Sequence, residues 1–162
     1  MAKVKVTGLT EFIKQLENVN QNTPKVMEET VKAGMQPVTD SLRSVIQGLK
    51  VDNRRYVRPG SGKKRYMMEI EKKGLLESMG YSPVRTNGTV YDSNAGVQGY
   101  NKLRTTEYKS GSPNKMLLDA IDSGTSFRYR QPIFSKVKKL SQDEAVKLMQ
   151  EALEEKIMRL TS

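Results

Sequence analysis

Residues 23–50 read TPKVMEETVKAGMQPVTDSLRSVIQGLK, and this stretch decides the fold. Thr23 is a good helix N-cap, and Pro24 suits the first helical position because its missing N–H would be unpaired there. Pro37 lies inside the stretch and predicts a bend over 33–37. Apolar residues then follow the three- and four-residue steps of one helix face: Met27, Val31, Met35, Val38, Leu42, Val45 and Leu49. The pattern predicts a helix of about seven turns over 24–49 whose apolar face is core or a subunit contact.

The residues before this helix predict a short strand and a short helix. Residues 3–7 alternate polar and apolar side chains and stop at Gly8, as a short strand does. The asparagines of 18–22 then separate the short helix from the long one. Its amphipathic pattern consists of Leu9, Phe12, Ile13, Leu16 and Val19.

The centre of the chain predicts a small antiparallel sheet. Residues 75–84 and 89–97 have the composition of two strands, and Asn87-Gly88 between them is a strong signal for a tight hairpin turn. Residues 51–73 and 98–114 are rich in charge, Gly and Pro and predict long basic loops. The short apolar element 115–122 favours a helical turn, with a strand as the alternative.

The end of the chain predicts a further amphipathic helix. Residues 141–144, Ser-Gln-Asp-Glu, match a capping box that would begin it. The apolar stripe that follows is Val146, Met149, Leu153, Ile157 and Leu160. Taken together, residues 1–162 are expected to form one α+β domain: a small antiparallel sheet packed by a long kinked helix, with a C-terminal amphipathic helix and long basic loops.

The composition argues against an enzyme. The chain has 162 residues with no Cys, which excludes disulfides and thiolate metal sites, and no His, the commonest general base and metal ligand. Only Asp119, Asp122 and Glu107 remain as candidate catalytic carboxylates. We therefore expect no metal, no cofactor and no small-molecule substrate. No apolar run approaches the ~20 residues of a membrane span or forms a signal peptide, so a soluble protein made in the cytoplasm is expected.

Positive charge is concentrated in two segments. Nine basic and three acidic residues give +6 in 50–73, and the same counts give +6 in 101–139, within a net charge of +10. The first block interleaves basic residues with tyrosine, so it could neutralise phosphates and stack on bases, meet an acidic protein surface, or merely aid solubility. The candidate contact residues of this basic arm are Arg54, Arg55, Tyr56, Arg58, Lys63, Lys64, Arg65 and Tyr66.

Four stretches, in order, resemble the head–tail joining and tail-completion proteins (putative tail components) of long-tailed lambdoid bacteriophages and prophages. The first is GLTEF at 8–12 with LENV at 16–19, and the second is the long helix. The third is GLLESM at 74–79. The fourth is DSGT at 122–125, followed by QPIF at 131–134 and a terminal amphipathic helix.

The resemblance implies a virion component at the neck or the head-proximal end of the tail, with no catalytic residues. Its partners would be copies of itself in a ring, with a hexamer favoured, neighbouring neck or tail proteins, and packaged DNA. No membrane partner is implied. Hydrophobic residues make up only 36% of the chain, which suggests a small core. Such a core suits a subunit that is stabilised by its neighbours, and it equally suits a domain with long loops. The alternative is a non-enzymatic nucleic-acid-binding protein acting through the arm 54–65, although no helix gathers basic residues on one face.

Overall fold

The structure is a computed structural model that describes residues 9–53, 62–104 and 107–161, without the side chains of 9–16, 18, 19 and 161. The fold is α+β, as predicted. Its helices are α1 (Leu9–Gln47), α2 (Glu69–Glu77), α3 (Asn114–Ser123) and α4 (Phe134–Thr161). Its strands are β1 (Met79–Tyr81), β2 (Arg85–Thr86), β3 (Tyr91–Asp92) and β4 (Ala95–Val97). The predicted strand 3–7 lies outside the described residues.

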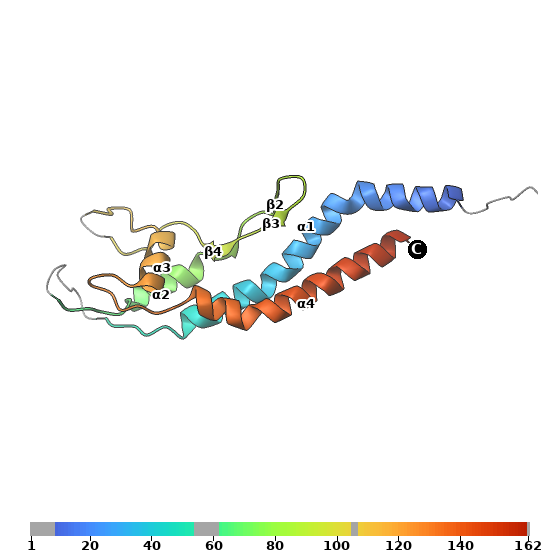
Figure 1. Cartoon of the computed structure of the whole chain (residues 1–162). Coiled ribbons are helices and arrows are strands. Elements are labelled where there is room, and N and C mark those ends of the chain that lie inside the picture. The colour runs from blue at the N-terminus through green and yellow to red at the C-terminus, as the bar shows by residue number, and fades with distance from the viewer. Residues whose placement is uncertain (1–8, 54–61, 105–106, 162) are drawn as a thin grey trace, which may run out of the picture.

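Two long helices, α1 and α4, run antiparallel and side by side through most of the molecule (Figure 1). An ion pair between Lys156 Nζ and Glu29 Oε2, 2.6 Å apart, marks the register of this hairpin. Gly34 lies at the contact between the helices: a Cβ there would be 2.6 Å from Met149 Cγ and Sδ, so the Met149 side chain would have to move. With residue 156 opposite 29, the last residue of α4 lies near the level of residue 24. The part of α1 before that level extends beyond α4 (Figure 1).

Helix α1 is longer than the sequence predicts. It is continuous over 39 residues, so the predicted interruption at 18–22 and the helix start at Thr23-Pro24 are wrong. The asparagines cost only a few tenths of a kcal/mol each as weak helix formers, and the flanking turns override that cost. Pro24 and Pro37 both lie inside α1, each removing one backbone N–H. The helix curves along its length, as internal prolines are expected to make it do (Figure 1).

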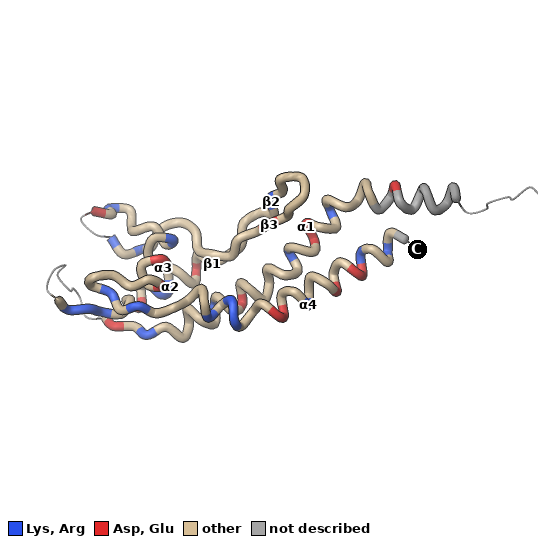
Figure 2. Tube along the Cα trace, in the orientation of Figure 1, with Lys and Arg blue, Asp and Glu red and all other residues tan. Residues whose placement is uncertain are grey.

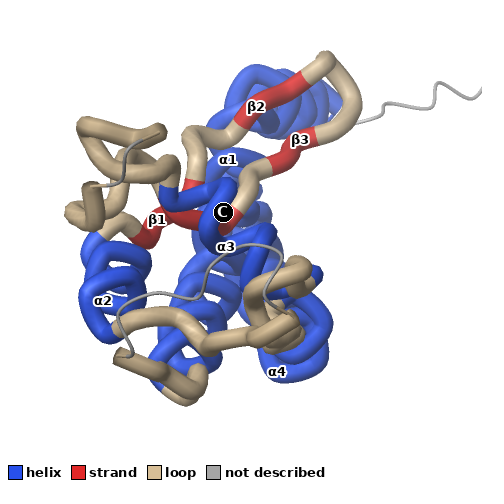
Figure 3. Tube along the Cα trace, turned by 90° about the vertical axis from the view of Figure 1, so that its left-hand side faces the viewer, coloured by secondary structure: helices blue, strands red, loops and turns tan. Residues whose placement is uncertain are grey.

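The hydrophobic core lies at one end of the hairpin, where α1 packs against α4 on one side and the strands on another (Figure 3). Helices α2 and α3 close this end. Leu42, in the middle of the predicted stripe, is 2% exposed. The most deeply buried apolar side chains come from five separate segments: Ile46, Met67, Leu75, Ile121 and Ile133. Among the described helices, none has an apolar stretch that could cross a lipid bilayer.

The sheet is smaller than the sequence predicts. The expected strand 75–84 is wrong in its first part, because α2 continues to Glu77 and places Leu75 in the core. Two short antiparallel ladders remain, β1 with β4 and β2 with β3. The reversal at Asn87-Gly88 is confirmed, but the turn spans four residues, and the Asn87 carboxamide oxygen accepts the N–H groups of Thr89 and Val90.

The helical alternative for 115–122 is confirmed by α3, whereas the predicted start of the last helix is wrong. Helix α4 begins at Phe134, seven residues before the expected capping box. Ser141 is buried inside α4, and its hydroxyl donates to the Val137 carbonyl at 2.9 Å. The predicted basic loops, 51–73 and 98–114, are also shorter than expected, because α2 begins at Glu69 and α3 begins at Asn114.

Candidate partner interface at the basic end

The structure divides the predicted basic arm into parts with different environments. Arg54, Arg55, Tyr56 and Arg58 lie outside the described residues. Lys63 and Lys64 are exposed, Tyr66 is half-buried, and Arg65 is buried at 9% exposure. Figure 2 shows the Lys and Arg residues gathered at the end of the molecule that holds α2, α3 and the connecting loops.

Arg65 belongs to a buried charge cluster, which corrects its assignment to an exposed contact arm. Its Nη2 lies 3.7 Å from Oε1 of Glu71, a carboxylate that is 1% exposed. Arg128 binds the same carboxylate with two bonds, Nη1 to Oε2 at 3.2 Å and Nη2 to Oε1 at 2.5 Å. Burial lowers the pKa of the Arg65 guanidinium from its usual value; Glu71 opposes that shift and Arg128 adds to it. The cluster needs all its members, because a buried charge without a partner is costly.

Backbone pairing holds the arm against the segment that carries Arg128. The Arg65 N–H donates to the Phe127 carbonyl, and the Tyr129 N–H donates to the Arg65 carbonyl, both at 3.0 Å. This pairing stacks the rings of Tyr66 and Tyr129, whose centroids are 4.8 Å apart. The stack forms one side of the basic end, with Tyr129 44% exposed.

An open groove of about 360 Å³ lies between the end of α1, this paired segment and the start of α4. Three cations of its lining, Lys50, Arg130 and Lys136, come from three different segments. No carboxylate of the described chain lies within ion-pair distance of them or belongs to the lining. The remaining lining residues are Ser44, Val45, Gly48, Leu49, Tyr66, Gln131 and Pro132. The groove therefore presents positive charge that no ion pair within residues 9–53, 62–104 and 107–161 neutralises.

Gln131 fixes the two walls of the groove to each other. Its carboxamide oxygen accepts the Lys50 N–H at 2.8 Å, and its Nε2 donates to the Lys50 carbonyl at 3.1 Å. The side chain thus pairs with both backbone groups of Lys50 as a neighbouring strand would. Because Gln131 is only 8% exposed, these bonds are shielded from competing water.

Asp122, one of the three carboxylates weighed for catalysis, positions α4. Its Oδ1 accepts the backbone N–H groups of Ile133 at 2.6 Å and Phe134 at 3.0 Å, the unpaired donors at the start of the helix. Glu107 and Asp119 are exposed. Within the described ranges, no three acidic side chains gather closely enough to hold a metal ion.

Asp122→Ala is expected to lower the free energy of unfolding by about 1 kcal/mol, because it leaves two helix-start N–H groups without their acceptor. Thermal or urea denaturation of the purified variant measures the change. Asp119→Ala is the matched control, since it removes the same charge from an exposed position of α3. Equal stability of the two variants would contradict the capping role.

Sequence reasoning did not find the groove, because its cations are far apart in the chain. Lys50, Arg130 and Lys136 are brought together because the antiparallel packing of α1 and α4 places the end of α1 beside the start of α4. The one local signal was the density of basic residues in each of the two charged segments. No family model matches the chain, and no curated protein and no solved structure is significantly similar to it.

Proposed function

We propose that this chain is a structural subunit that assembles with copies of itself and with neighbouring virion proteins, in head–tail joining or tail completion. The observation that carries the proposal is the apolar surface that the α1–α4 hairpin leaves uncovered. The ring, with six copies favoured, and the place at the neck or head-proximal tail come from the resemblance described above.

Helix α4 presents apolar side chains that α1 does not cover. Within the predicted stripe, Met149, Leu153 and Leu160 are half-buried, while Val146 and Ile157 are 49% and 42% exposed. Leu140 and Met158 are still more exposed, at 61% and 65%. Val146 and Ile157 are eleven residues apart, about three helical turns, so they lie on one face of α4, and exposed apolar side chains on one face suit a contact with another protein.

The start of α1 adds a second uncovered element. It extends beyond the end of α4 (Figure 1), and its sequence carries the apolar pattern Leu9, Phe12, Ile13, Leu16 and Val19. The end of a helix that extends past its neighbour gains little stability from its own hydrogen bonds in water, because helix stability in proteins comes mostly from packing an apolar face. A second subunit would supply that packing.

The residues of the family-like motifs have structural roles in this chain, which also supports a non-catalytic subunit. In the 122–125 motif, Asp122 caps α4, and Gly124 adopts a φ of +76°, a conformation that favours glycine. In the 131–134 motif, Gln131 joins α1 to the start of α4, and Ile133 is fully buried.

We expect electron microscopy with antibody labelling to place the protein at the neck or tail end of purified particles, in a small integral number of copies. The measurement uses particles of the phage or prophage that encodes the chain. Absence from the particles would contradict the proposal and indicate an assembly factor. Hundreds of copies along the tail or shell would contradict it too and indicate a tube or capsid subunit.

A double variant tests whether the exposed apolar face of α4 is needed for the protein to be incorporated into particles. Val146→Glu with Ile157→Glu should leave the chain folded, since both side chains are exposed, but remove it from particles because charge then lies in the contact. Gln142→Glu with Gln150→Glu is the matched control, adding the same charge at exposed polar positions of α4. Normal incorporation of the first pair would refute this surface as the contact.

A further inference from the structure

The three groove cations lack a carboxylate partner, whereas several basic residues of the helices have one. Lys32 pairs with Glu28, Lys156 with Glu29, and Lys147, Arg159 and Lys73 each pair with a carboxylate four residues away. Lys50, Arg130 and Lys136 have no such partner among the described residues. Unneutralised charge of one sign in a concave surface concentrates ligands of the opposite sign there.

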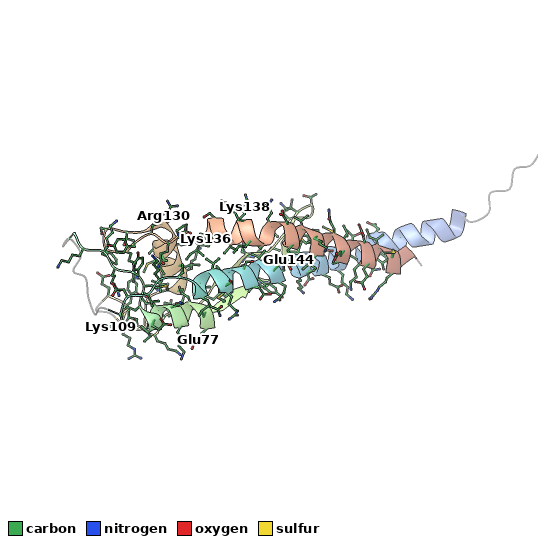
Figure 4. The ribbon with its side chains drawn as sticks, turned by 90° about the horizontal axis from the view of Figure 1, so that it is seen from below. Glu77, Lys109, Arg130, Lys136, Lys138 and Glu144 are labelled. Carbon is green, nitrogen blue, oxygen red and sulfur yellow. The ribbon has the colours of Figure 1, made fainter. Side chains whose placement is uncertain are left out.

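The structure also fixes the backbone positions that carry Lys50 and Lys136, and it holds the Arg130 side chain itself. Both backbone groups of Lys50 are bonded to Gln131, and the Arg130 Nε donates to the Asp122 carbonyl at 3.2 Å. Lys136 lies in the first turn of α4, whose start Asp122 fixes. Figure 4 shows Arg130, Lys136 and Lys138 along one edge of this end, with Lys109 and Glu77 along the opposite edge. A preorganised set of donors loses less entropy when an anion binds.

Aromatic rings lie beside these cations. Tyr66 lines the groove with the Lys50 ammonium 5.8 Å from its ring centroid, and Tyr129 stacks on Tyr66. The exposed Tyr129 ring offers an apolar surface beside the positive charge. Cations next to an exposed aromatic ring match a nucleotide, which carries a phosphate and a stacking base, whereas an acidic peptide offers carboxylates without the base.

We propose that this groove binds the phosphate backbone of a nucleic acid, with Lys50, Arg130 and Lys136 neutralising phosphates and Tyr129 stacking on a base. The volume of about 360 Å³ accommodates a single nucleotide unit. The site differs from the basic arm 54–65 because its cations come from the ends of the two long helices and the loop before α4. The inference is independent of the assembly proposal, since it concerns the isolated chain.

The test measures fluorescence anisotropy of a labelled 20-nucleotide DNA, single-stranded and as duplex, with the purified full chain between 50 and 200 mM salt. Each phosphate contact contributes about 0.7 to 0.9 to the slope of log affinity against log salt. Lys50→Gln, Arg130→Gln and Lys136→Gln together should therefore reduce the slope by about two to three. The control triple Arg104→Gln, Lys109→Gln and Lys115→Gln removes the same charge from exposed positions elsewhere and should leave most of the slope.

Tyr129→Leu separates stacking from charge. It should weaken single-stranded DNA binding at least about fivefold without changing the salt slope. Equal slope losses in the two triple variants would overturn the proposal, because net charge alone would then explain binding. Competition by poly-glutamate as strong as by DNA would overturn it in favour of an acidic protein partner. Melting curves of each variant confirm that the compared proteins are folded.

Discussion

Glu71→Gln is expected to lower the free energy of unfolding by about 3–5 kcal/mol, enough to unfold much of the protein at 37 °C. The substitution keeps the shape of the side chain but leaves the buried guanidinium groups of Arg65 and Arg128 without their shared carboxylate. Glu71 Oε2 also accepts the Met68 N–H at 2.7 Å, and the single carboxamide oxygen of glutamine cannot serve this N–H and both guanidinium groups at once. Urea denaturation followed by circular dichroism measures the loss.

Two variants make this result specific to the buried cluster. Glu77→Gln removes a carboxylate from the same helix, but Glu77 is exposed and pairs with exposed Lys102, so little change is expected. Arg65→Met, Glu71→Leu and Arg128→Met together should recover most of the stability, because replacing a whole buried ion cluster by apolar side chains removes its desolvation cost. If Glu71→Gln melted like Glu77→Gln, the cluster would not hold this end together.

Leu42→Asp is expected to prevent soluble expression. Leu42 is 2% exposed in the centre of the core, and the aspartate would place an unpaired charge where no partner is available. The milder Leu42→Ala should cost about 2–5 kcal/mol and allow measurement by denaturation. Arg43→Asp, at the exposed neighbouring position, controls for the aspartate itself. Wild-type melting of the Leu42 variants would remove this helix face from the core.

A helix was predictable from the sequence where its apolar periodicity extends over many residues. The residues at which the helices begin and end were not predictable. The stripe from Met27 to Leu49 predicted the main helix, and its members Leu42 and Leu49 are in the core. The limits depend on contacts that are distant in sequence. Asp122 starts α4 from eleven residues away, so the local capping box at Ser141 was misleading. The short strands of the sheet likewise follow from packing against α1, which no local pattern contains.

The candidate site was predictable only as a region. Charge density marked the segment that includes Arg65, and that density favoured an exposed loop. The structure instead buries Arg65 because Glu71 and Arg128 meet it, and those two residues are 57 positions apart. The groove forms only when residue 50 meets residues 130–136, about 80 positions further along the chain. Tertiary partners of this kind have no signature in a local window of sequence.

The packing of α1 against α4 also has a consequence for the chain while it is being made. Residues 48–133 must be translated before α4 begins to emerge, which takes roughly 4–17 s at ordinary ribosomal rates. Through that interval the buried face of α1, including Val26, Val31 and Met35, has no helix to cover it. The nascent chain therefore presents a long hydrophobic face to the cell, and chaperones have several seconds in which to bind it before the hairpin closes.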